Sequence, residues 1–264
     1  MPEMPMDVVQ MAVAVEAPWA EQLDRHNRRQ RMEAAARIVR RLAHDFGNIL
    51  TGILGFSELA LSQQADLDSP MYLYLTEIHR GAQNGAQYTD QLRLFARQQT
   101  TVKRGCRLTD VLGELGSGEV QVKLRLPADL PAVAVEAEAL RQVLAIVLDN
   151  AREAISGSGV IEISAETVQV DAQEAGELFG DVRPGTHLEI RIADNGSGLT
   201  PEAQRLLFAE PFFSTKSRKR GFGLAMAYGI LSGHRGGLEL LRRPEGGTIA
   251  RLIVPVAAVA APSL

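Results

Sequence analysis

Cysteine is almost absent from this sequence, since Cys106 is the only one among 264 residues. A single thiol cannot form a disulfide framework within the chain, and no Cys-x-x-Cys pair or Cys/His cluster suggests a zinc site. These two classes of stabilised fold are therefore excluded. We expect Cys106 to be an incidental residue rather than a redox sensor.

Long apolar runs and an excess of positive charge are missing as well. No stretch approaches the roughly 20 apolar residues that cross a bilayer as a helix, and the first residues lack the basic segment of a signal peptide. The net charge of −4 and the pI of about 5.8 argue against a general nucleic-acid binder. We expect a cytoplasmic protein with no membrane span and no nucleic acid as partner.

The composition and the turn residues divide the chain into parts. Hydrophobic residues make up 45% and charged residues 23% of the chain, as in a globular protein with a real core. The length suits one or two domains. We expect a mobile tail (1–18), a helical domain (19–100), a hinge (101–107), an α/β domain (108–256) and a second tail (257–264).

Two long amphipathic helices are predicted in the helical domain. Apolar residues at the three- and four-residue steps of one helical stripe follow the first: Ala35, Ile38, Leu42, Phe46, Ile49, Ile53, Phe56 and Ala60. The second opens at Pro70, and its stripe is Met71, Leu75, Ile78, Ala82, Gly85, Thr89, Leu92 and Ala96. Neither helix can bury its stripe alone. Pairing two such hairpins in a homodimer gives a four-helix bundle, although a monomeric hairpin covered by the second domain would also serve.

One histidine of the first helix points away from the apolar stripe. His44 lies two residues from both Leu42 and Phe46, so at about 100° per residue it faces nearly the opposite way. Asp45 follows it directly, and Asn48, four residues on, shares its face. Most surface histidines have no special role. An exposed imidazole beside a carboxylate becomes a candidate nucleophile if the chain also binds a phosphate donor.

Strands and helices alternate in the second half of the chain, which predicts an α/β sandwich. We expect helices at 108–115, 136–155 and 221–233, and strands at 120–126, 160–170, 186–193, 238–241 and 248–254. The glycine- and acid-rich piece at 171–185 is expected to be a loop with a helical turn.

Four short pieces of this half have residues that can bind a nucleotide. The first two can bind the metal ion and the base of that nucleotide. Asn150 lies on the long helix, and its carbonyl oxygen is a hard ligand for Mg²⁺ that already sits on phosphates. Asp194 ends a strand and can accept a hydrogen bond from an exocyclic amine. The following Gly196 and Gly198 let the backbone approach a flat base.

The other two pieces suit phosphates and a lid. Aromatic residues from Phe208 onward can hold a lid, and Thr215 and Lys216 can contact phosphates. The last piece opens a helix with Gly221, Gly223 and Leu224. Free N–H groups and the helix dipole favour an anion there. Each piece alone is more often a turn, but all four in this order form a far more specific signal.

In this order the pieces resemble the sensor histidine kinases of two-component systems, which have a GHKL-type ATP-binding domain with the Bergerat fold. The family's N, G1, F and G2 boxes match Asn150, Asp194-x-Gly196-x-Gly198, residues 208–216 and Gly221-x-Gly223. Residues 42–54 resemble its H box of the His-Asp-x-x-Asn kind. The resemblance covers nearly everything from about residue 30 to 256.

The resemblance implies a role for each residue of the H box. His44 would be the phosphoacceptor, Asp45 its acid–base partner, and Asn48 would position water when phosphate is later removed from the partner. The donor would be ATP with Mg²⁺, with Asn150 as a metal ligand. The final acceptor would be an aspartate on a separate response regulator. We expect the signal to enter through the arginine-rich stretch 25–41 or through a separate sensor protein.

Two alternatives stay open at this point. One is a histidine phosphotransferase with a non-functional nucleotide domain, and the other is a GHKL ATPase or serine kinase. Ile146 stands one turn before Asn150, where related ATPases place a water-activating glutamate, and this argues against simple ATP hydrolysis. Lys219 stands where many members of the family have a glycine. Gly47 inside the H box costs about 1 kcal/mol relative to alanine, and we expect it to allow a local bend.

Overall fold

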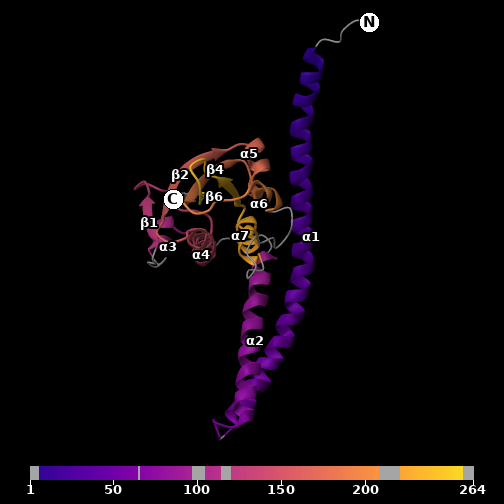
Figure 1. Cartoon of the computed structure of the whole chain (residues 1–264), viewed down its shortest axis with the longest axis vertical. Coiled ribbons are helices and arrows are strands. Elements are labelled where there is room, and N and C mark those ends of the chain that lie inside the picture. Colours follow the sequence, from indigo (N-terminus) through magenta and orange to yellow (C-terminus); the bar gives the residue numbers. More distant parts are fainter. Residues whose placement is uncertain (1–5, 65, 97–104, 114–119, 208–220, 258–264) are drawn as a thin grey trace, which may run out of the picture.

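The chain folds into a helical hairpin and an α/β sandwich, which is the predicted fold class (Figure 1). The computed structural model describes residues 6–64, 66–96, 105–113, 120–207 and 221–257, with side chains from residue 30 onward and without that of Arg205. The helices are α1 Met6–Ser62, α2 Pro70–Phe95, α3 Leu108–Leu112, α4 Ala137–Ala154, α5 Ala172–Glu177, α6 Pro201–Leu206 and α7 Phe222–Gly233. The strands are β1 Gln121–Arg125, β2 Val160–Val170, β3 Phe179–Gly180, β4 Gly185–Asp194, β5 Gly237–Arg242 and β6 Thr248–Pro255.

The first helix begins earlier than we expected. It starts at Met6 rather than near Trp19, and so includes most of the stretch 1–18 that we assigned to a mobile tail. Positions 6–17 have no clear apolar period, but they are mostly Met, Val, Ala, Gln and Glu, which helices accept at small cost. Pro18 removes one backbone hydrogen bond, while its fixed φ of about −65° is itself helical. None of the described helices has an apolar stretch that would let it cross a bilayer.

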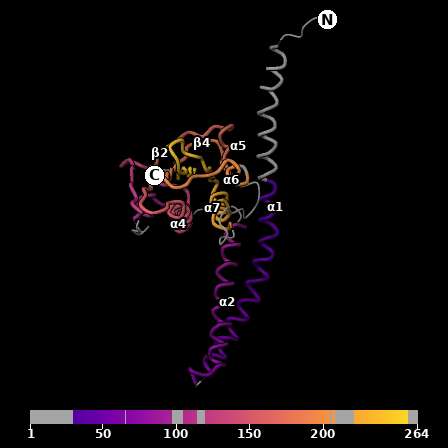
Figure 2. Tube along the Cα trace, in the orientation of Figure 1, coloured from indigo at the N-terminus to yellow at the C-terminus, as the bar shows by residue number. Residues whose placement is uncertain are grey.

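The two long helices form an antiparallel hairpin whose turn lies at the lower end of the view (Figure 2). The second helix begins where predicted, because Ser69 caps it by accepting a hydrogen bond from the N–H of Tyr72 at 3.2 Å, and Pro70 follows. The contact face of α1 differs from the predicted stripe. Ala43 is fully buried and Ser57 is 4% exposed, whereas Phe56 of the stripe is 75% exposed.

Small residues explain this difference. On the contact faces of the hairpin, Ala43 and Ala82 are buried, and Gly85 meets Leu50 so closely that an added Cβ would lie 2.9 Å from its Cδ2. Two helices approach best through such residues, because bulky ones would hold their backbones apart. The large apolar side chains of α1 therefore remain on its outer face: Ile38, Leu42, Phe46, Ile49, Ile53, Phe56 and Leu59.

The sandwich is built on a six-stranded sheet in the order β1-β2-β4-β6-β5-β3. The β1–β2 pair is parallel and all the others are antiparallel. Alternate residues such as Ile163, Ile190 and Leu252 are buried on the face that α4 and α7 cover. This packing fixes α4 and α7 above the strand ends, which positions the site described below.

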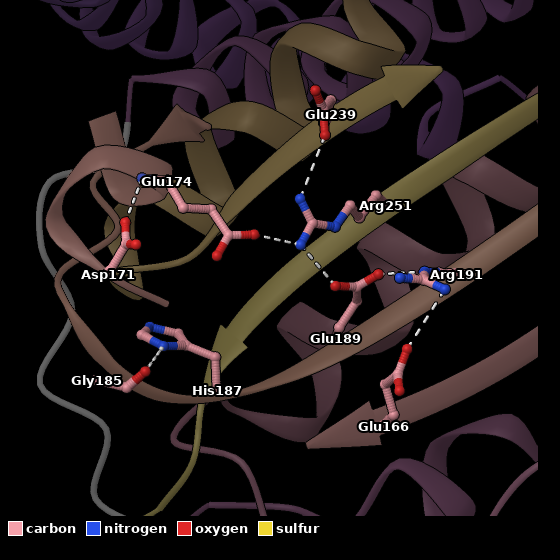
Figure 3. A network of polar contacts seen from close by, with 9 residues as sticks. All are labelled: Glu166, Asp171, Glu174, Gly185, His187, Glu189, Arg191, Glu239 and Arg251. Carbon is pink, nitrogen blue, oxygen red and sulfur yellow. Dashed lines mark hydrogen bonds and ion pairs between the residues drawn. The ribbon is translucent and has the colours of Figure 1, made fainter. Parts of the chain in front are cut away.

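The other face of the sheet contains an ion-pair network (Figure 3). Glu189 of β4 is fully buried and pairs with Arg191 and with Arg251 of β6. The Nη2 atom of Arg251 lies 2.8 Å from Oε2 of Glu189. Arg251 also pairs with Glu174 of α5 and Glu239 of β5. The hydrogen bond with Glu189 is the main reason that the pKa of Arg251 is raised. These pairs tie α5 to the central strands.

Two short elements and two boundaries differ from expectation. The piece at 171–185 contains β3 as well as the helical turn α5, and α6 follows the Thr200 cap; neither β3 nor α6 was predicted. Of the expected hinge 101–107, positions 105–107 are described, and Cys106 exchanges two backbone hydrogen bonds with Val133, at 3.1 and 2.9 Å. That end of the segment is therefore anchored to the sandwich. Ala257 of the expected tail donates to the carbonyl of Ala132 at 2.8 Å.

The sandwich meets the hairpin where α7 packs on the end of α2 (Figure 1). Phe95 is 2% exposed and belongs to the same apolar cluster as α4, α7 and the sheet. A Cβ at Gly229 of α7 would lie 2.6 Å from the Cα of Phe95, so only glycine permits this approach. Arg40 links α1 to the same end of α2, because its Nε and Nη2 donate hydrogen bonds to the carbonyl of Ala96 at 3.1 and 2.9 Å.

Candidate functional site

A cavity of about 620 Å³ opens between α4, the ends of the strands, α7 and the flank of α2. Such a volume accommodates a nucleotide-sized ligand. Six of the residues that we predicted to bind a cofactor line it: Asn150, Asp194, Gly198, Gly221, Gly223 and Leu224. The fold therefore brings together pieces that are more than 70 positions apart in the sequence.

Asp194 is held firmly at the end of β4. It is 4% exposed, and its Oδ1 accepts hydrogen bonds from the N–H groups of Gly196 at 2.8 Å and Thr248 at 3.2 Å. Among the described residues its Oδ2 has no hydrogen-bond partner. Asp194 lines the cavity, so this oxygen can accept a hydrogen bond from a ligand there. An exocyclic amine of a base can be the donor of that hydrogen bond.

The glycines after Asp194 serve different purposes. Gly198 has a φ of 73°, in the left-handed region, and a Cβ there would lie 2.9 Å from the carbonyl oxygen of Gly247. Gly198 lines the cavity, so the backbone itself forms that part of the wall. Gly196 does not line it, although we predicted a binding role. It packs against Ala154 at the end of α4, whose Cβ would lie 2.8 Å from an added Cβ.

The wall formed by α4 presents Asn150 beside an apolar neighbour. A Cβ at Gly223 of α7 would lie 3.9 Å from Nδ2 of Asn150 and 3.4 Å from Cγ2 of Ile146. The carboxylate-bearing residues Asp149 and Glu153 line the same wall. Asp149 pairs with Arg152 at 3.1 Å, and the amide oxygen of Asn150 is a hard ligand that suits Mg²⁺ arriving on phosphates. Among the described residues, no group of three or more His, Cys, Asp and Glu side chains forms a metal site of its own.

The start of α7 is a candidate anion site beside this wall. Gly221 precedes the helix with φ 67° and ψ 11°, a left-handed conformation that suits glycine, and α7 then runs for 12 residues. Its first N–H groups have no partner within the helix, and the helix dipole adds a partial positive charge. Phosphates bind readily at such an end.

The phosphoacceptor candidate lies on the hairpin. The side chains of His44 and Asp45 are 72% and 63% exposed, and His44 Nδ1 lies 3.2 Å from Asp45 Oδ1. Asn48 is exposed on the following turn. The structure therefore exposes the imidazole beside a carboxylate, as the helical spacing predicted.

Some predicted residues lie outside the described part of the chain, and some lining residues were not predicted. Phe208, Thr215, Lys216 and Lys219 belong to the stretch 208–220, which the structure does not describe. Tyr88 and Gln91 of α2 line the cavity, and Thr248 fixes Asp194. No pattern in the sequence could have indicated the α2 residues, because their place at the cavity depends on how α7 docks.

Comparison with known families agrees with this division of the chain. Residues 34–101 match the family model of the His Kinase A (phospho-acceptor) domain. Residues 135–258 match that of the histidine kinase-, DNA gyrase B- and HSP90-like ATPases. The first range contains His44 and the hairpin, and the second contains the whole cavity wall of the sandwich.

Several curated proteins are similar to the chain over most of its length. Sensor kinase CckA of Brucella abortus is 29% identical over 236 residues, which are 86% of this chain and 25% of that protein. Histidine-protein kinase AtoS of Escherichia coli is 28% identical, covering 86% and 36%. Nitrogen regulation protein NtrY of Azorhizobium caulinodans is 30% identical, covering 82% and 28%. The chain thus spans between a quarter and about a third of these relatives.

A solved structure has a similar fold over most of this chain. Full-length ShkA in complex with AMPPNP superposes with a TM-score of 0.59 and 20% identity, covering 86% of this chain and 47% of that one. At this identity the match shows a shared fold.

Proposed function

The chain belongs to the sensor histidine kinases of two-component systems, and we propose that it phosphorylates its own His44 from ATP. It then passes the phosphoryl group to an aspartate of a separate response regulator. The observation that supports this proposal most is the pairing of two features. The first is the cavity beside α2, which is lined by the buried carboxylate of Asp194 and the start of α7. The second is the exposed His44–Asp45 pair on α1, the helix that packs against α2.

The cavity walls suggest how ATP is held. Asp194 Oδ2 accepts a hydrogen bond from the amine of the base, and the backbone at Gly198 lies against the ring. The N-terminus of α7 receives phosphate oxygens. Asn150 would hold Mg²⁺, which when bound neutralises charge on the phosphates.

The pair on α1 suggests how the imidazole reacts. With Asp45 accepting from Nδ1–H of His44, the proton stays on Nδ1 and the lone pair of Nε2 faces outward. Nε2 is then the atom that attacks the γ-phosphorus in line. Asn48, one turn on and exposed, would position water when the response regulator is dephosphorylated. ATP as the donor sets this reaction in the cytoplasm.

The outer face of α1 suggests a homodimer. Its large apolar side chains are 40–75% exposed in the single chain, and the sandwich packs on α2 instead of covering them. Exposed apolar patches of this kind mark an interface. Burying two such faces against each other gives the four-helix bundle.

The proposal is tested by incubating the purified chain with ATP labelled at the γ-phosphate and Mg²⁺. We expect label that is lost in acid and retained in alkali, as for a phosphorylated imidazole. His44→Gln should abolish it, and Asn150→Ala should reduce it strongly. Asn84→Ala, at an exposed position of α2, serves as the matched control and should label like the wild type.

The same experiment separates the two alternatives. A phosphotransferase with a non-functional nucleotide domain would take no label and show no saturable binding in a nucleotide titration with Mg²⁺. A GHKL ATPase or serine kinase would release labelled phosphate or carry acid-stable label on a hydroxyl. Either result would contradict the proposal.

A further inference from the structure

Gly47 of the H box has no side chain, and the side chain of Arg93, from the other helix of the hairpin, packs against it. A Cβ at this position would overlap Nη2 of Arg93 on α2 and lie 3.2 Å from its Cζ. The methyl group of Thr89, one turn earlier on α2, would be 3.8 Å away. The guanidinium of Arg93 thus occupies the volume that any other residue at position 47 would fill.

This contact lies on the same flank of α1 as the phosphoacceptor. At about 100° per residue, His44 stands about 60° from Gly47 around the helix and Asn48 about 100°, both in the same direction. The residues buried against α2, such as Ala43, lie on the other side of Gly47. His44 and Gly47 are three residues apart, so their Cβ positions are about 5–6 Å apart. The guanidinium therefore lies one helical turn from His44.

Arg93 can exchange its present partner at low cost. Its Nη1 donates to Asp90 of the same helix at 3.1 Å, and the two side chains are 50% and 68% exposed. An exposed pair at this spacing contributes little to stability. Arg40 also lies on this flank, one turn before His44, but its Nε and Nη2 are bound to the carbonyl of Ala96. Arg93 can thus turn toward His44 from α2, the helix that also lines the cavity.

Residues from the same part of α2 line the cavity in which we propose that ATP binds. Tyr88 and Gln91 line the cavity, while Thr89 and Arg93 face α1. Arg93 therefore stands on the segment that separates the cavity from the H box. Dimerisation leaves it accessible, because the apolar face of α1 is on the side opposite to His44.

From this geometry we propose that Arg93 binds the phosphoryl group on His44, and that Gly47 is glycine because it gives the guanidinium its place. The inference rests on the proposed function of His44 as phosphoacceptor. A guanidinium presents paired N–H donors that match two oxygens of a phosphoryl group. The absence of a side chain at position 47 thus leaves room for the guanidinium of Arg93, in addition to allowing a local bend.

The step in which Arg93 acts is a phosphoryl transfer. The lone pair of His44 Nε2 forms the bond to the γ-phosphorus, the bond from that phosphorus to the β–γ bridging oxygen breaks, and ADP leaves with the bonding electrons. The positive charge left on the ring is relieved when the Nδ1 proton passes to Asp45. Arg93 meets the negative charge on the transferred phosphoryl oxygens, which is the charge that catalysts of this transfer must stabilise.

Two variants test the inference in the full chain, each with a matched control. Arg93→Met removes the charge, and Arg80→Met is its control, since Arg80 makes the same i,i+3 pair on α2 with Glu77 at 2.6 Å. Gly47→Ala displaces the guanidinium but favours the helix. Gly52→Ala is its control, because a Cβ there meets nothing within 4 Å. Arg93→Lys keeps a charge without the paired donors.

Two readouts are measured on each variant. The first is the rate of labelling from ATP and Mg²⁺. The second is a ³¹P NMR titration of the phosphoryl group on His44 after chemical phosphorylation with phosphoramidate, with His44→Gln as the blank. We expect Arg93→Met to slow labelling about ten- to hundredfold, as for loss of a hydrogen bond to a charged group. It should also raise the pKa of the phosphoryl group, with nucleotide affinity unchanged.

Gly47→Ala should change both readouts in the same direction, Arg93→Lys should restore part of the loss, and the two controls should stay within twofold of the wild type. Wild-type labelling and an unchanged phosphoryl titration in Arg93→Met would overturn the inference. If the wild type took no label from ATP, the proposed function would fail, and the titration of the phosphoramidate-treated chain would still decide whether Arg93 binds the phosphoryl group.

Discussion

The hydrogen bonds of Asp194 indicate its role in binding a ligand. One carboxylate oxygen is occupied by two backbone N–H groups, and the other faces the cavity without a partner among the described residues. Asparagine has the same shape and keeps one acceptor oxygen for those N–H groups. It would place an amide donor where the carboxylate now accepts.

We therefore predict that Asp194→Asn folds normally but binds ATP about ten- to hundredfold more weakly, the cost of losing a hydrogen bond to a charged group. Isothermal titration calorimetry measures this directly. Asp129→Asn, in an exposed loop, is the control and should bind like the wild type. Equal affinity in Asp194→Asn and the wild type would remove Asp194 from the site.

Cys106 gives a prediction about pH. Partial burial, helped by the nearby Asp110, raises the pKa of its thiol. The folded state therefore retains the thiol proton at a pH where the unfolded state has lost it, so stability falls as pH rises above the ordinary thiol pKa. Iodoacetamide should alkylate the native protein more slowly than the urea-unfolded protein at pH 8. Equal rates would contradict the environment described for Cys106.

At the scale of elements, the docking of α7 on α2 depends on Gly229. Its Cα lies so near Phe95 that any side chain would press on backbone rather than on a mobile side chain. We predict that Gly229→Ala destabilises the protein by about 1–3 kcal/mol through overpacking. Thermal unfolding measures the loss. Gly81→Ala, at an open position of α2, should be neutral or stabilising; destabilisation by both would point to a general effect of the substitution.

The ion-pair network behind the sheet gives a second prediction at this scale. Arg251→Met would leave the buried Glu189 with Arg191 as its remaining partner. Breaking a buried pair costs about 3 kcal/mol or more. Arg125→Met breaks the exposed pair with Glu162 and should cost less than about 1 kcal/mol. Urea unfolding of the two variants compares them, and equal losses would mean that burial of Glu189 adds nothing.

The elements also show what a sequence can predict. The strand at 160–170 was predicted to the residue, because apolar and polar residues alternate from Ile161 to Ala165 and again from Val168 to Val170. The two residues of β3 are too few for any period to be visible. The packing face of α1 was assigned wrongly, because the apolar stripe outweighed the small residues that close helix packing selects. Local patterns predicted residues that line the cavity, namely Asn150, Asp194, Gly198, Gly221 and Gly223, while Tyr88 and Gln91 reach it only through domain docking.

At the scale of the whole molecule, the exposed face of α1 leads to a prediction about assembly. The chain has a mass of 28.6 kDa, and we expect a dimer of about twice that mass in solution. Ile49→Asp places a charge on the face and should give the monomer. Leu124→Asp, on an equally exposed apolar residue of β1, should remain dimeric. Sedimentation velocity distinguishes the two masses, and a wild-type monomer would contradict the bundle.

The proposed function requires that a phosphoryl group passes from ATP bound in the cavity of the sandwich to the exposed imidazole of His44 on the hairpin. The measurement that tests this most directly is phosphosite mapping by mass spectrometry, at neutral to alkaline pH, after incubation with ATP and Mg²⁺. We predict a single phosphorylated residue, His44. Phosphate on a serine or threonine, on another histidine, or nowhere at all while ATP is bound would contradict the account.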